Sequence, residues 1–343
     1  MRAAPSHSAA PRSIVDAPSE FLHAKLHGKN SVLFQGEALR ELVRQATPED
    51  VARRLLPDVS VADLDDLERR LMAACVRDLA RLLKFTGGAR HAFYFALLTR
   101  YPLNDLKALL RMRAAQSSES LPGAASRELP PGLELPPAVA EAEDVEELVG
   151  RIPFATVRGR VVAALPAWRE AQTAAVLEMA VNQGYWQAVR EALGRLGPVE
   201  RGRCAEAVEA ECEAARVLAV LRAGRTYAMP WEMLAPLMPP AVGRGLSTSA
   251  LRRLHADPSA ETLRSVAPWT GVEDVEDIGD VGERLWSRTL RTAARQFRAG
   301  QDGITALIGY YYAKRGELRH LLGLTQMLRY GRSAEEILAF LEV

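Results

Sequence analysis

Four arginines near the C-terminus form the most regular arrangement of charged groups in this sequence. They fall at i, i+3, i+7 and i+10 on an expected helix, and they are Arg288, Arg291, Arg295 and Arg298. An apolar stripe follows the opposite side of the same helix and consists of Trp286, Leu290, Ala294 and Phe297. A guanidinium binds carboxylates and phosphates through paired hydrogen bonds. Charged stripes usually face water, and the functional alternative is a contact with acidic side chains of a partner protein or with lipid headgroups.

Histidines and cysteines offer two further arrangements, one for metal binding and one for thiol chemistry. His23 and His27 have the i, i+4 spacing of a metal-binding pair, but no third ligand follows at a suitable distance. Cys204 and Cys212 lie two turns apart on one expected helix without a neighbouring base, and the remaining cysteine is Cys75. We therefore predict surface histidines and a buried structural role for Cys204 and Cys212, with neither a metal nor a cofactor.

The acidic run 273–283 is a third candidate for cation binding. It alternates acids with Val, Ile and Gly, and it lacks the spacing of a calcium-binding loop. Acids are favoured at the first turn of a helix, because they complement the helix dipole. We predict a linker followed by a negatively charged helix start.

Motifs for nucleotide hydrolysis and for covalent catalysis are missing from the sequence. Gly87-Gly88 is not followed by Lys, and Gly243-Arg-Gly245 is a lone Gly-x-Gly pair without a preceding strand. Neither paired carboxylates nor a nucleophile with its base can be recognised. These observations predict a protein without catalytic activity of its own.

Composition and charge argue against several classes of partner. The chain has 343 residues with 44 basic and 43 acidic side chains, a net charge of +1, so no overall field attracts nucleic acid or an anionic membrane. No stretch approaches the ~20 apolar residues of a membrane span, and the first residues lack the apolar core of a signal peptide. Three cysteines fit a reducing compartment. We predict a cytoplasmic protein with only peripheral membrane association.

Apolar residues recur at helical spacing along almost the whole chain, which predicts an all-α fold. Residues that typically begin helices occur at Thr47-Pro48, at Asp257-Pro258 and at Ser333 with Glu336. A single core rarely supports so long a chain, so we expect several domains. The predicted divisions are a disordered tail 1–15, a helical domain 16–120, a linker 121–137, and further helical domains 138–225 and 226–343.

One helical stripe occurs three times. Asp105, Glu213 and Glu317 are each followed by apolar residues one, four and five positions later. Glu213 lies 108 residues after Asp105, and Glu317 lies 104 residues after Glu213, so the period is that of domains. The principal apolar members are Leu106 and Leu110, Val217 and Leu218, and Leu318 and Leu322. We predict that these stripes form core and that the acids can be solvated neighbours.

The repeats resemble a family of rotor proteins from V/A-type (vacuolar/archaeal-type) rotary ATPases, known there as the C-subunit family and in eukaryotic vacuolar pumps as the d-subunit. Segment 106–111 looks like the family's Asn-Leu-x-x-Leu-Leu-Arg helix, and 312–319 is similar to its Tyr-x-x-Lys-Glu-x-Glu helix. Segment 21–25 stands where the family begins with a Tyr-x-x-Ala helix. The chain departs from the pattern at Phe21, Asp105 and Arg315, and in the second repeat at 214–215.

The resemblance implies three related helical-bundle domains in a pseudo-threefold, funnel-like arrangement. It implies a non-catalytic coupling protein that joins the central shaft to the membrane rotor ring, as one copy per complex, for proton or sodium transport or ATP synthesis. The arginine row would then contact a neighbouring part of the rotor. Two other functions stay open, namely a helical adaptor unrelated to ATPases and a nucleic-acid-binding protein that uses the arginine row.

Overall fold

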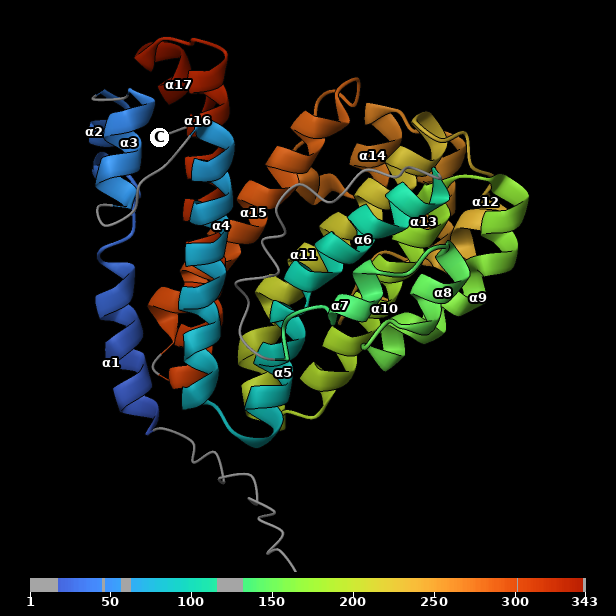
Figure 1. Ribbon diagram of the computed structural model, residues 1–343, viewed down its shortest axis with the longest axis horizontal. Helices are drawn as coiled ribbons and strands as arrows, with labels where there is room; N and C mark the ends of the chain where they lie inside the picture. The colour runs from blue at the N-terminus through green and yellow to red at the C-terminus, as the bar shows by residue number, and fades with distance from the viewer. Residues whose placement is uncertain (1–17, 45–46, 57–62, 116–131, 301, 342–343) are drawn as a thin grey trace, which may run out of the picture.

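The computed structural model describes residues 18–44, 47–56, 63–115, 132–300 and 302–341. In these ranges every regular element is a helix and no strand occurs, which confirms the predicted all-α fold (Figure 1). The predicted tail 1–15 and most of the predicted linker lie outside the described residues.

The helices fall into three consecutive stretches of the chain. The first holds α1 (Ser19–Asn30), α2 (Glu37–Arg44), α3 (Pro48–Leu55), α4 (Leu64–Ala80), η1 (Arg81–Phe85), α5 (Gly88–Leu98) and α6 (Arg100–Ala114). The second holds α7 (Pro137–Ala140), α8 (Val145–Gly150), α9 (Ala155–Ala171), α10 (Ala174–Gly194) and α11 (Pro198–Arg225). The third holds α12 (Trp231–Leu234), η3 (Ala235–Leu237), α13 (Thr248–Ala256), α14 (Ala260–Val266), η4 (Pro268–Thr270), α15 (Ile278–Ala299), α16 (Gly303–Arg329) and α17 (Ala334–Phe340).

Capping residues determine where several helices begin. Thr47 Oγ1 accepts a hydrogen bond from the Asp50 amide at 3.2 Å, and Ser333 with Glu336 forms a complete capping box. A start was also predicted at Asp257-Pro258, but α14 begins later, because its N-cap is Ser259. Asp257 instead accepts a hydrogen bond from the Ser259 hydroxyl. The acidic run behaves as predicted at its end, where Asp277 caps α15.

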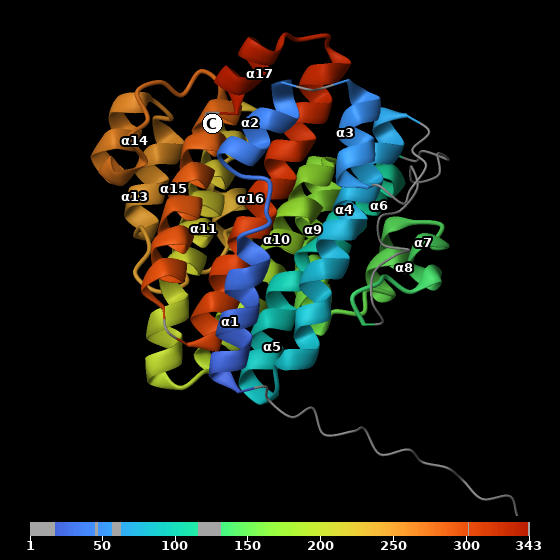
Figure 2. The same cartoon turned by 90° about the vertical axis from the view of Figure 1, so that its left-hand side faces the viewer.

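Long helices in contact form the body of the molecule. Helix α16 packs against α1, α4 and α15, while α11 packs against α13, α15 and α16. Helix α10 lies against α9, α5 and α6 (Figures 1 and 2). The buried apolar side chains form one continuous cluster that draws on all three predicted domain ranges, so the domain boundaries stay predictions.

Helices α9 and α10 are in close contact at a glycine, Gly184. A Cβ added to Gly184 would lie 2.6 Å from the Val157 Cα atom. Only a residue without a side chain permits this contact, which explains why glycine occupies the middle of a long helix.

None of the helices in the described ranges combines the length and apolar character needed to cross a membrane. This observation agrees with the hydropathy of the sequence.

Candidate functional site

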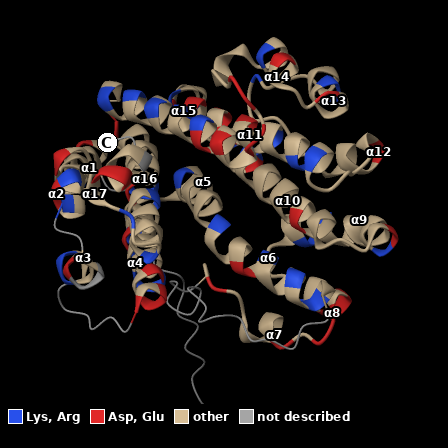
Figure 3. Ribbon diagram, turned by 90° about the horizontal axis from the view of Figure 1, so that it is seen from above, with Lys and Arg blue, Asp and Glu red and all other residues tan. Residues whose placement is uncertain are grey.

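The predicted arginine row lies on α15, and its members point to two different sides. The core side of α15 is formed by Val281, Leu285, Thr289 and Thr292, which are buried. Arg291 and Arg298 are exposed, whereas Arg288 is half-buried. Seen from above, the basic positions of α15 lie beside acidic positions of α11 (Figure 3).

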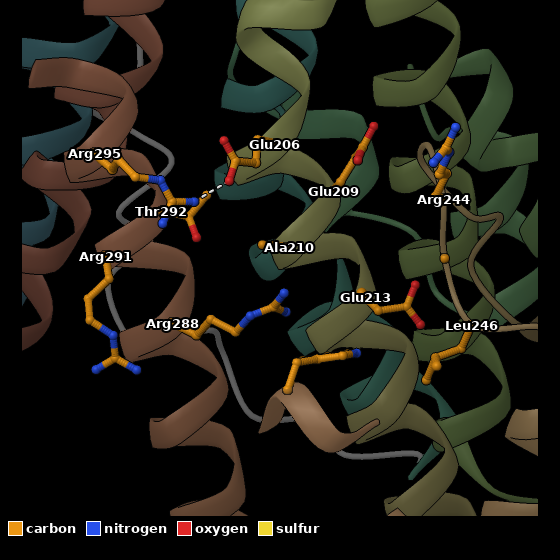
Figure 4. A pocket seen from close by; sticks show the side chains of 12 residues that line it. Glu206, Glu209, Ala210, Glu213, Arg244, Leu246, Arg288, Arg291, Thr292 and Arg295 are labelled. Atoms are coloured by element: carbon orange, nitrogen blue, oxygen red, sulfur yellow. Dashed lines mark hydrogen bonds and ion pairs between the residues drawn. The ribbon is translucent and has the colours of Figure 1, made fainter. Parts of the chain in front are cut away.

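The first side of the row faces a pocket of about 510 Å³ between α11 and α15 (Figure 4). Its acidic wall comes from α11 and consists of Glu206, Glu209 and Glu213. Arg295 forms an ion pair with Glu206, while Arg291 points away from these acids. Both members of the ion pair are more than half exposed, so it contributes less than about 1 kcal/mol.

The Arg288 side chain contacts an aromatic ring that lines the same pocket. Its guanidinium carbon lies 3.9 Å from the centroid of the Trp269 ring, a cation–π geometry. Burial lowers the pKa of Arg288, and the negative charges of Glu213 and Glu206 oppose that shift. Two of the four predicted interface arginines, Arg288 and Arg295, therefore make contacts within the chain. Arg295 is exposed despite its ion pair, and Arg291 and Arg298 are exposed as well.

The acids of the threefold repeat lie on α6, α11 and α16. Asp105 is half-buried, but Glu213 and Glu317 are only 8% and 3% exposed, so these two are not the solvated neighbours that we expected. Glu213 accepts a hydrogen bond from Arg216 at 3.0 Å. Glu317 accepts one from the Phe34 amide at 2.8 Å and also pairs with Lys314. Burial of a carboxylate requires such partners.

The apolar members of the repeat face inward to different degrees. Leu106, Leu110 and Val217 are fully buried, and Leu318 is 7% exposed. Leu218 and Leu322 are half-buried and pack against the core.

A buried ionic cluster joins the three repeat-bearing helices. The Glu211 carboxylate of α11 accepts hydrogen bonds from Arg100 of α6 at 2.5 Å and from Arg315 of α16 at 2.8 and 3.1 Å. Tyr312 donates a further hydrogen bond to it at 2.9 Å. Glu211 and Arg315 stand at equivalent positions, two residues before Glu213 and Glu317.

Electrostatics in this cluster favour the charged state of the carboxylate. Burial alone would raise the pKa of Glu211, but Arg100 and Arg315 lower it to about 2. The Arg315 guanidinium also lies 4.5 Å from the Trp286 ring centroid. The cluster is therefore an ionic contact between three helices in which the Glu211 carboxylate is charged at neutral pH.

The histidine pair lies where α1 meets the end of α15. The ring centroids of His23 and His27 are 4.3 Å apart, and the His27 ring stacks on Phe297 at the same centroid separation. Both side chains are half-buried, so each is partly exposed at the surface. Within the described residues no group of three or more His, Cys, Asp or Glu side chains is placed to hold a metal ion.

The three cysteines are buried and unpaired, and burial raises the pKa of each thiol to about 12. A thiol with so high a pKa is a poor nucleophile at neutral pH. This confirms the predicted burial of Cys204 and Cys212, and Cys75 is buried as well.

Sequence reasoning missed two features of this region. The acids Glu206, Glu209 and Glu213 repeat at i, i+3 and i+7, which matches the spacing of Arg288, Arg291 and Arg295 and was visible in the sequence. No local signal singled out Arg100 or Glu211, because their partners are more than a hundred residues away.

Comparisons with known proteins give one family. The family model described as ATP synthase (C/AC39) subunit matches residues 22–340, almost the whole chain. No curated protein matches the chain.

Proposed function

This chain belongs to the ATP synthase (C/AC39) subunit family, and we propose that it is the coupling element of the central rotor in a V/A-type ATPase. The family is a non-catalytic part of a rotary ATPase complex, so other proteins of such a complex are its partners. In the proposed role the chain links the central shaft to the membrane rotor ring. It transmits rotation and performs no reaction itself.

The buried ionic cluster that joins α6, α11 and α16 is the observation that best supports this role. A coupling part must carry torque without deforming, and close-packed protein interiors have low compressibility. Arg100, Glu211 and Arg315 hold three long helices by charge-assisted hydrogen bonds in a buried setting. Such bonds resist sliding of one helix against another, because any shift leaves a buried charge without its partner.

The finer architecture is part of the proposal. The three repeats would be related by a pseudo-threefold axis in a funnel whose interior receives the foot of the shaft. One copy per complex would sit on the cytoplasmic face of the membrane, held there through the ring. The transported ion is proton or sodium.

Affinity purification from native membranes tests the role. The tagged full-length chain should co-purify with the shaft proteins and the membrane ring, identified by mass spectrometry. Deletion of the chain should abolish ATP-driven ion transport, and the isolated protein should not hydrolyse ATP. A partner set without ATPase proteins would refute the proposal.

If only soluble proteins unrelated to ATPases co-purified with the chain, the adaptor function would be supported instead. Nucleic-acid binding predicts an affinity that falls steeply with salt concentration, which a titration at two salt concentrations measures. Family membership weighs against both alternatives.

A further inference from the structure

A groove of about 1120 Å³ runs between α15 and the α1–α2 region, with α16 as its floor. Figure 2 shows α1 in front of α16, with α15 alongside. The lining of the groove on α15 extends from Asp280 to Arg298, which spans about 27 Å of helix. That length matches a segment of about five helical turns.

The rim of the groove on α15 is basic. Arg284, Arg291 and Arg298 line it at intervals of seven residues, so they share one side of the helix. All three are exposed, and no ion pair is formed by any of them with the described part of the chain. Asp280 and Glu283 lie at one end, where Glu283 is paired with Arg319. The rest of the rim keeps its positive charge.

The wall below this rim is apolar. Trp286 and Leu290 are half-buried and Ala294 is exposed, and all three line the groove. Most of the predicted apolar stripe of α15 is therefore accessible from the groove and is not fully buried in the core. Three buried ring nitrogens of groove residues have no hydrogen-bond partner in the described ranges, and they are His27 Nε2, Trp286 Nε1 and His320 Nδ1. An unsatisfied buried polar group costs roughly 1–3 kcal/mol.

We propose that this groove binds one amphipathic α-helix of a partner protein, whose apolar side faces Leu290 and Ala294 and whose acidic side chains recur every seven residues. The charge of the rim selects the acids, because Arg284, Arg291 and Arg298 have the same seven-residue interval. The length of the groove and its apolar wall favour a helix as the occupant, and binding of an amphipathic helix in a groove is a recurring mode of recognition. The inference rests on the proposed function, since it assigns the partner to the rotary complex.

Photo-crosslinking in the assembled complex tests the inference. A photoreactive residue replaces Ser287, which lines the groove, and in a separate control it replaces Val162 of α9, which is exposed and remote from the groove. Irradiation should join position 287 to an acidic helix of another ATPase protein, identified by mass spectrometry. The control position should give no such product.

Charge reversal on the two sides of α15 provides the matched comparison. The R291E/R298E double variant should lower the yield of the crosslink by about tenfold, whereas R288E/R295E on the α11 side should change it by less than about twofold. Circular dichroism checks that both variants fold. If R291E/R298E prevents assembly, R291Q/R298Q should still lower the yield, because it removes the charge without reversing it.

Several results would overturn the groove assignment. They are a crosslink to a second copy of this chain, to residues 1–17 of the same chain, to lipid, or to a segment without regularly spaced acids. An intact complex that gives no product at position 287, or equal losses in both double variants, would overturn it as well. The complex would still co-purify in those cases, whereas failure of the proposed function appears as loss of co-purification by the unmodified chain.

Discussion

Glu211 provides the sharpest test of how this molecule resists deformation. The Glu211→Gln variant keeps the size of the side chain and removes its charge. Arg100 and Arg315 would then share a neutral amide in a site where Glu211 is only 6% exposed. Two half-buried guanidinium groups would lose the carboxylate that they share within the cluster, so we expect a large loss of folding free energy.

The magnitude follows from two independent estimates. The pKa of Glu211 is lowered from 4.5 to about 2, by about 2.5 units, and each pKa unit corresponds to about 1.4 kcal/mol, which gives roughly 3–4 kcal/mol. Removal of one member of a buried ion pair costs about 3–5 kcal/mol. Both estimates place the loss at about 3 kcal/mol or more.

Urea unfolding followed by circular dichroism and tryptophan fluorescence measures this loss. The matched control is Glu206→Gln on the same helix, whose ion pair with Arg295 is more than half exposed. That variant should lose less than about 1 kcal/mol. A Glu211→Gln variant as stable as the control would show that the cluster does not hold the helices together.

Acid titration supplies a second readout for the same side chain. The folded pKa of Glu211 lies below its ordinary value, so its carboxylate contributes stability above about pH 4.5. That contribution is lost as the pH falls toward about 2. The variant should lack this part of the acid dependence, and an unchanged acid profile would contradict the argument.

Two further substitutions and one labelling experiment test the packing. Gly184→Ala should cost about 1–3 kcal/mol in thermal unfolding because its Cβ meets the Val157 backbone, whereas Gly194→Ala on the same helix has open space and should be neutral or stabilising; equal effects would contradict the close approach. Tyr312→Phe should cost roughly 1–3 kcal/mol through its lost hydrogen bond to Glu211, and a neutral result in urea unfolding would refute it. At pH 8 a thiol reagent should label the native cysteines far more slowly than the unfolded ones, and rapid native labelling would disprove their burial; the thiols are Cys75, Cys204 and Cys212.

Local patterns were enough to predict the class of fold and the buried stripes. The apolar spacing after Asp105, Glu213 and Glu317 lies on three long helices in the structure, because a helix shows its buried side in its own periodicity. Capping residues such as Ser333 indicated helix starts for the same reason, since they act on amides three residues away. Order and spacing of these repeats also carried the family resemblance, which the family model shows over residues 22–340.

The partners of each helix face were decided only by the tertiary structure. Periodicity placed four arginines on one stripe of α15, but it could not tell that Arg295 meets Glu206 of α11 while Arg291 lines an open groove. Nor could it bring Arg315 to Glu211, which lies 104 residues earlier in the chain. A sequence specifies the direction of a side chain about its own helix axis, whereas the neighbour in that direction depends on how all the helices pack at once.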